Sequence, residues 1–121
     1  MKELLVFIIV MSLAGLAGAA PGVAVRMTSR DAFVPKTLTI KVGDTVVWEN
    51  DSPGVHTVTD NSAFASAKRD ASMPAGTEPF NSGPVEAGKQ YSHTFTAPGI
   101  YKYFCVPHEA DGMVGTIVVT K

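Results

Sequence analysis

The sequence has a single cysteine and no marked excess of either charge. One cysteine cannot form an internal disulfide, so Cys105 is a free thiol, an intermolecular bridge or a metal ligand. The ten Lys and Arg residues nearly balance the eleven Asp and Glu residues, and the formal net charge is −1. There is neither a basic face nor an RNA-binding aromatic motif, so we expect no nucleic-acid partner. Repeats, low-complexity tracts and internal linkers are also absent, and 121 residues suit one domain better than two.

Long apolar runs are confined to the N-terminus, and there the run is short. Lys2 precedes it, and a small-residue stretch that contains Ala17-Gly18-Ala19 follows. This order of charge, apolar core and Ala-x-Ala is typical of a cleaved signal peptide, with cleavage after Ala19 or, alternatively, after Ala20. We assign residues 1–20 to the signal peptide and residues 21–121 to one mature domain. A retained membrane anchor is the alternative, but the run is shorter than the ~20 residues that span a bilayer.

Apolar and polar residues alternate through most of the remaining chain. Alternation with a period of two indicates half-buried strands, and Gly- and Pro-containing turns separate the segments. The expected strands lie near residues 23–27, 37–41, 45–50, 90–96, 100–105 and 115–120. Only Ala63 to Ala71 reads as a short helix, ended by Met73-Pro74-Ala75-Gly76. Many short strands and little helix predict an all-β antiparallel sandwich or barrel with Greek-key connections.

The chemistry-bearing residues gather in one loop near the C-terminus. Cys105, His108 and Met113 follow the spacing Cys-x₂-His-x₄-Met. Taken singly, the cysteine could be a small buried hydrophobe, the histidine a surface residue and the methionine a core residue. Together they offer a thiolate, an imidazole and a thioether, which suit a soft or borderline transition metal. With His56 from an upstream loop they complete the His₂Cys set with an axial Met that defines blue copper.

Longer segments resemble the small blue copper proteins, or cupredoxins, which include plastocyanins, pseudoazurins and amicyanins. Residues 101–108 and 112–115 are similar to the plastocyanin copper loop. Residues 42–50 and 56–58 resemble the strand and loop that carry the first histidine, and residues 80–83 resemble the segment before the penultimate hairpin. The resemblance implies a Greek-key β-sandwich of about eight strands, with at most one short helix. It also implies one copper ion, cycling between Cu(I) and Cu(II), with the ligands His56, Cys105, His108 and Met113.

The sequence departs from plastocyanins at two positions beside the ligands. Plastocyanins usually have asparagine after the first histidine, hydrogen-bonded toward the cysteine loop, where this chain has Thr57. They have a tyrosine of their docking surface before the cysteine, where this chain has Phe104. The acidic runs that guide plant plastocyanins to their partner have no equivalent. The resemblance therefore implies an electron carrier and leaves its partner open.

We expect a monomeric, soluble one-electron carrier that docks redox partner proteins near His108, among apolar residues such as Val106, Pro107 and Val114. Export to the periplasm is expected, with the thylakoid lumen as the alternative compartment. Copper binding for trafficking is the alternative function, although a carrier of that kind normally exposes Met or Cys clusters.

An enzyme such as a copper oxidase or nitrite reductase needs further His-rich copper sites, which three histidines cannot supply. The third histidine, His93, is expected to be a core or edge residue rather than a fifth ligand. A metal-free adhesive sandwich would leave the clustered ligands unexplained.

Overall fold

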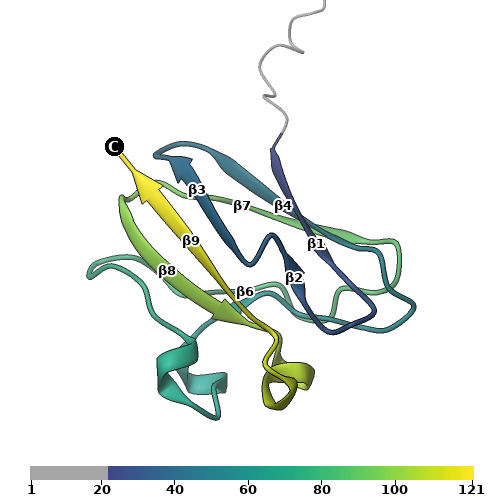
Figure 1. The fold of residues 1–121 in the computed structure, drawn as a ribbon. Coiled ribbons are helices and arrows are strands. Elements are labelled where there is room, and N and C mark those ends of the chain that lie inside the picture. The colour runs from purple at the N-terminus through teal and green to yellow at the C-terminus, as the bar shows by residue number, and fades with distance from the viewer. Residues whose placement is uncertain (1–21) are drawn as a thin grey trace, which may run out of the picture.

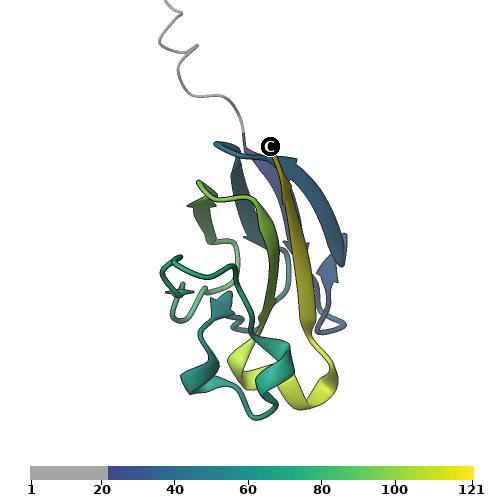
Figure 2. The same cartoon turned by 90° about the vertical axis from the view of Figure 1, so that its left-hand side faces the viewer.

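The computed structural model describes residues 22–121, which form two facing β-sheets (Figures 1 and 2). The predicted signal peptide lies outside the described residues. The first sheet has the strand order β2 (Phe33–Val34), β1 (Val23–Met27), β4 (Thr45–Asn50), β7 (Gln90–Thr94). The second has the order β3 (Thr37–Lys41), β9 (Val114–Thr120), β8 (Gly99–Phe104), β5 (Thr59–Asp60), β6 (Phe80–Asn81).

The predicted all-β sandwich is confirmed, with nine strands in the described part of the chain. The strands are not all antiparallel, because β1 pairs with β4 and β3 pairs with β9 in parallel. Alternation of apolar residues indicates which face of a strand is buried. It carries no information on which neighbour the strand pairs with, so the two parallel pairs could not be predicted.

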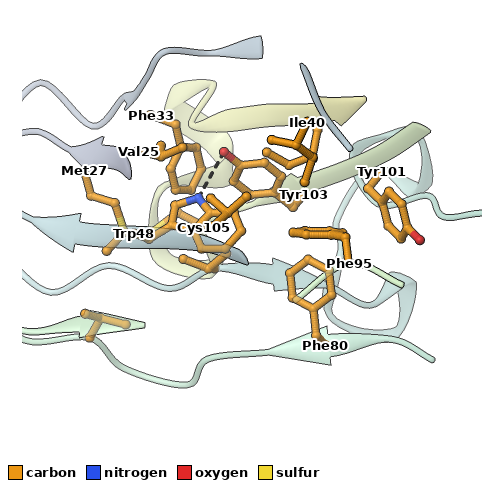
Figure 3. Packing of buried hydrophobic residues seen from close by; sticks show 14 of the residues in the cluster. Val25, Met27, Phe33, Ile40, Trp48, Phe80, Phe95, Tyr101, Tyr103 and Cys105 are labelled. Atoms are coloured by element: carbon orange, nitrogen blue, oxygen red, sulfur yellow. Dashed lines mark hydrogen bonds between the residues drawn. The ribbon is translucent and has the colours of Figure 1, made fainter. Parts of the chain in front are cut away.

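Strand β4 supplies the centre of the core. Its residues alternate between half-buried and buried positions, and Val46 and Trp48 are fully buried as the alternation predicts. The Trp48 indole N–H donates to the Tyr103 hydroxyl of the opposite sheet at 3.1 Å, and the two rings meet edge to face (Figure 3). Buried Tyr and Trp side chains need partners for their polar ends. This pair therefore joins the two sheets through a contact that is both apolar and polar.

The short helix predicted at residues 63–71 is replaced by two separate 3₁₀ turns, η1 (Ser62–Phe64) and η2 (Lys68–Asp70). Between them Ala65 and Ala67 have extended backbone angles. The backbone N–H groups of Ser66 and Ala67 donate to the Glu109 carboxylate instead of to helix carbonyls. The contact with Glu109 thus uses two backbone N–H groups that a continuous helix would need for its own hydrogen bonds.

A third 3₁₀ segment, η3 (Val106–Asp111), connects β8 to β9. It ends at Gly112, whose left-handed φ of 82° suits glycine. The loop after β4 reaches the same end of the sandwich, and the coil of η1 and η2 lies beside η3 in both views (Figures 1 and 2). Among residues 22–121, no helix has the length and apolar character needed to cross a membrane.

Candidate metal centre

The C-terminal loop is held by its own backbone hydrogen bonds. The Cys105 N–H donates to the Met113 carbonyl at 3.0 Å, and the Met113 N–H donates to the His108 carbonyl at 3.2 Å. The His108 N–H donates in turn to the Cys105 carbonyl at 3.2 Å. Three of the four predicted ligand residues are therefore tied together at the level of the backbone. Their side chains start from fixed positions.

His56 lies in the loop after β4, and its backbone N–H and carbonyl are both hydrogen-bonded to Val85. Its N–H donates to the Val85 carbonyl at 3.2 Å, and its carbonyl accepts from the Val85 N–H at 2.7 Å. The buried Asn50 amide braces the same loop by donating to the carbonyls of Gly54 and Val85 at 2.8 and 2.9 Å. No sequence pattern singles out Asn50, because its hydrogen-bond partners are backbone atoms up to 35 residues away.

The side chains of His56, Cys105 and His108 converge at the end of the sandwich. The two imidazole Nδ1 atoms lie 3.2 Å apart, and the Cys105 Sγ lies 3.6 Å from the Nδ1 of His56 and 3.4 Å from that of His108. A point in the middle of a triangle of this size lies about 2 Å from each corner, which is the length of a bond from a metal to imidazole or thiolate. The donor atoms therefore fit a single metal ion.

Hydrogen bonding and burial keep a lone pair available on His56. Its Nε2–H donates to the Thr28 carbonyl at 3.2 Å, which leaves Nδ1 unprotonated and facing the cysteine sulfur. The pKa of His56 is lowered by burial, and charge on the neighbouring His108 imidazole lowers it further. A neutral imidazole is the form that binds metals.

The thiol of Cys105 is fully buried, and burial raises its pKa. The Thr57 backbone N–H opposes this by donating to the sulfur at 3.3 Å, and the His108 backbone N–H also favours the thiolate. A metal ion would supply the remaining stabilisation, because a coordinated thiol is deprotonated. We therefore expect Cys105 to be a thiolate when a metal ion is bound and mainly a thiol when it is not.

Thr57, the first departure from plastocyanins, connects the two ligand loops by its hydroxyl as well. The Val106 N–H donates to the Thr57 Oγ1 at 2.8 Å, and this hydroxyl lies 2.8 Å from the Thr59 hydroxyl. Thr59 donates to the Asn81 Oδ1 at 2.9 Å. A directed chain of hydrogen bonds thus runs from the cysteine loop to β6. Thr57 therefore holds the cysteine loop by accepting a hydrogen bond at its hydroxyl oxygen.

His108 is the ligand candidate nearest to solvent. Its side chain is 25% exposed, whereas His56 is 1% exposed and Cys105 is fully buried. Its Nε2 lies 3.5 Å from the Asp31 Oδ1, across a shallow hollow of 220 Å³ that both histidines line. Asp31, a non-glycine residue with a left-handed φ of 55°, was not predicted to approach the site.

Met113 and His93 are the remaining candidate ligands. Met113 is fully buried and directly follows Gly112, and its role as the axial ligand stays a prediction. His93 stacks on Phe80 with ring centroids 4.2 Å apart and packs edge to face on Phe95, as a core or edge histidine would. Within the described residues, His56, Cys105 and His108 are the only group of His, Cys, Asp or Glu side chains arranged to hold a metal ion.

The profile of the copper-binding proteins of the plastocyanin/azurin family matches residues 23–120. The chain belongs to this family. Its cofactor is copper, and the soft thiolate and imidazole donors described above fit that metal. The expected resemblance to small blue copper proteins is thereby confirmed.

Plastocyanins from algae, plants and cyanobacteria are among the relatives. The chain is 40% identical to chloroplastic plastocyanin of Chlamydomonas reinhardtii over 72% of this chain and 57% of that protein. It is 36% identical to chloroplastic plastocyanin of Silene latifolia subsp. alba over 86% of this chain and 64% of that protein. It is 38% identical to plastocyanin of Nostoc punctiforme over 73% of this chain and 64% of that protein. The chain thus spans less than two-thirds of the length of these relatives.

Solved structures share the fold. A purple cupredoxin from Nitrosopumilus maritimus aligns with a TM-score of 0.61 and 26% identity, over 81% of this chain and 99% of that one. A mutant amicyanin in its reduced Cu(I) form aligns with a TM-score of 0.63 and 30% identity, over 84% of each chain. The copper-containing nitrite reductase of Thermus scotoductus aligns with a TM-score of 0.65 and 30% identity, over 85% of this chain and 23% of that one. These likenesses confirm a cupredoxin-like sandwich.

Proposed function

We propose that this protein is a single-electron carrier with one type 1 copper ion. The proposed ligands are the Nδ1 atoms of His56 and His108, the Cys105 thiolate and, as a weak axial ligand, the Met113 thioether. The observation that carries the proposal is the near-equilateral arrangement of the first three donor atoms, with separations of 3.2 to 3.6 Å. Copper bound there supplies a one-electron couple between Cu(I) and Cu(II).

The protein's own contribution is rigidity. The hydrogen bonds of Val85 and Asn50 hold the His56 loop, and those of Thr57 hold the Cys105 loop. Fixed donors resist the change of geometry that the two copper oxidation states would otherwise favour, which suits rapid electron transfer. Because His108 alone of the three donors is partly exposed, we propose its ring edge as the place where electrons enter and leave.

Apolar residues around that edge support docking of redox partner proteins. Val106 and Pro107 are exposed directly before His108, and Val55 and Phe64 are exposed on neighbouring loops. Redox encounters use small interfaces, under ~1,200 Å². A patch formed by a few such side chains is therefore adequate.

Copper trafficking and catalysis are the competing functions. Trafficking requires ready metal exchange, which burial of Cys105 and His56 opposes. The nitrite reductase that shares the fold is an enzyme by name, but the present chain corresponds to only 23% of it. The described residues hold one metal-binding group. We therefore propose an electron carrier that is not itself an enzyme.

We further propose that residues 1–20 are removed on export and that residues 21–121 form a monomeric copper domain. The periplasm is the proposed compartment, with the thylakoid lumen as the alternative. Several relatives are named as chloroplastic, and a balanced charge with one buried cysteine is compatible with either. N-terminal sequencing of protein secreted by a bacterial host tests the cleavage site. A mature chain that retains Lys2 would contradict it.

The function is tested by loading the purified protein with Cu(II) and recording the visible spectrum during redox titration. A thiolate-bound type 1 site gives an intense blue absorption that a reductant bleaches and an oxidant restores. The Cys105→Ser variant should lose this band. A chelator should remove copper slowly from the wild type, whereas rapid transfer would favour trafficking. A colourless Cu(II) complex would contradict the proposed carrier.

A further inference from the structure

A hollow of 340 Å³ on the outer side of β8 and β9 is lined by positively charged side chains. The cations come from three separate segments: Lys36 before β3, Arg69 in η2 and Lys102 in β8. The lining is completed by Asp70 and by Val114, Gly115 and Thr116 of β9. In a chain with a formal net charge of −1, this concentration of cations is a local departure from the average.

Within residues 22–121 none of the three cations has an ion-pair partner within 4.0 Å, although Asp70 attracts Arg69 and Lys102 at longer range. Between residues 22 and 121, the ion pairs within 4.0 Å are Arg26 with Asp51 and His108 with Asp31. The one carboxyl in the lining, Asp70, lies against the Glu109 carboxylate, and burial together with this neighbour raises the pKa of Asp70. With Asp70 ionised, the lining keeps an excess of two positive charges, and the Glu109 carboxylate beside Asp70 lowers the local excess to one.

The hollow adjoins the metal centre. The Glu109 carboxylate, one residue after His108, accepts the backbone N–H groups of Ser66 and Ala67 at 2.9 and 3.0 Å. This contact holds the η1 and η2 segment, which carries Arg69, against the ligand loop (Figure 2). Val114 in the lining directly follows Met113. A molecule seated over the three cations therefore lies beside the loop that carries His108.

We propose that this cationic hollow receives an acidic surface segment of the redox partner, while the apolar residues around His108 make the contact through which the electron passes. The proposal rests on the proposed electron-carrier function. Complementary charge at the edge of an interface mainly accelerates and orients encounter, and its effect is screened by salt. That combination suits a partner that must bind quickly and leave quickly.

Binding is tested with hexaglutamate as the acidic segment, using backbone amide chemical shifts of the isotopically labelled, copper(I)-loaded chain and of the copper-free chain. Saturable shifts are expected at Arg69, Lys102 and Thr116. Raising the ionic strength from about 0.01 M to about 0.15 M, which shortens the screening length from about 30 Å to about 8 Å, should weaken binding about tenfold. Shifts that are scattered over the surface, or that resist salt, would overturn the proposal.

Two matched variants separate this hollow from general charge. Arg69→Gln with Lys102→Gln should weaken hexaglutamate binding about tenfold, which is the effect of losing two screened charges at contact. Lys41→Gln with Lys121→Gln removes the same charge from exposed positions at the opposite end of the strands and should leave binding unchanged. Equal losses in both variants would overturn the proposal. Inorganic phosphate that binds in the hollow while hexaglutamate does not would also overturn it and assign a small-anion site instead.

Electron transfer gives an independent measurement. Oxidation of the copper(I) protein by the anion hexacyanoferrate(III) should slow in the Arg69→Gln/Lys102→Gln variant, and oxidation by the cation tris(1,10-phenanthroline)cobalt(III) should not slow. Parallel slowing with both oxidants would contradict an electrostatic role. Hexaglutamate binding is measured without copper as well, so loss of the copper function with retained binding refutes the electron carrier. An intact blue centre with no binding refutes the cationic docking site.

Discussion

Replacement of Asp60 by asparagine should stabilise the protein, and the gain should depend on pH. Asp60 lies in β5 with no exposed surface, and neither of its carboxylate oxygens has a hydrogen-bond partner within residues 22–121. Burial raises its pKa from 3.8 to about 7. The nearby Tyr101 hydroxyl does not compensate, because it donates to the Ala97 carbonyl. Ionisation of the Asp60 carboxyl group therefore destabilises the folded state.

The size of the effect follows from the two pKa values. A rise of about three pH units corresponds to about 4 kcal/mol, at 1.36 kcal/mol per unit. The sign is set by the raised value: the folded state holds the proton more tightly, so stability is lost as pH rises from the unfolded pKa to about 7. Above about pH 7 the full cost is present, and below about pH 4 it disappears. Asparagine has no charge to bury at any pH.

The assay is guanidinium unfolding of the copper-loaded wild type and of Asp60→Asn, at about pH 4 and about pH 8. The variant should exceed the wild type by up to about 4 kcal/mol at the higher pH and differ little at the lower pH. Asp111→Asn, which removes an exposed carboxylate, serves as the control. A stability difference between Asp60→Asn and wild type that is the same at both pH values would refute this account of the buried carboxyl.

Three further substitutions test other parts of the structure. Gly115→Ala should destabilise the fold by ~1–3 kcal/mol in guanidinium unfolding, because its Cβ would lie 2.4 Å from the buried Tyr103 ring; an unchanged midpoint would contradict the packing described. Asp31→Asn should raise the reduction potential by roughly 10–40 mV, because loss of a negative charge beside His108 disfavours Cu(II) and a partly exposed pair contributes ~0.2–1 kcal/mol; voltammetry that finds a lower potential would contradict it. Thr57→Val should cost ~1–3 kcal/mol of unfolding free energy by leaving a loop N–H without its acceptor, with recovery in Thr57→Ser; equal loss in both variants would show that the hydroxyl is not responsible.

The sequence was most informative where the chemistry is contiguous. Cys105, His108 and Met113 lie in one loop, so their spacing alone indicated a metal site, and the alternation around Trp48 correctly identified the core face of β4. His56 was selected because a blue copper site needs a second imidazole, and the family resemblance then supported that choice, since no local pattern links it to a loop far downstream. The structure supports that pairing by bringing both Nδ1 atoms to the cysteine sulfur.

The remaining features depend on long-range contacts that no local pattern records. The Glu109 carboxylate accepts a backbone N–H group of the helix predicted near residue 66. The Asp31 carboxylate lies close to the His108 imidazole from a separate loop. The burial of Asp60 could not be predicted from the sequence either, because aspartate is usually exposed at the surface or in a turn. Such residues are identified only when the sheets are assembled, since each acts through an atom supplied by a distant segment.

The proposed copper site is tested most directly by a crystal structure of the copper-loaded protein with anomalous scattering recorded at the copper absorption edge. The account predicts one copper ion per chain, bonded at about 2 Å to both histidine Nδ1 atoms and to the Cys105 sulfur, with Met113 as a longer axial contact. Copper bound away from Cys105, or held only by nitrogen and oxygen atoms, would contradict it.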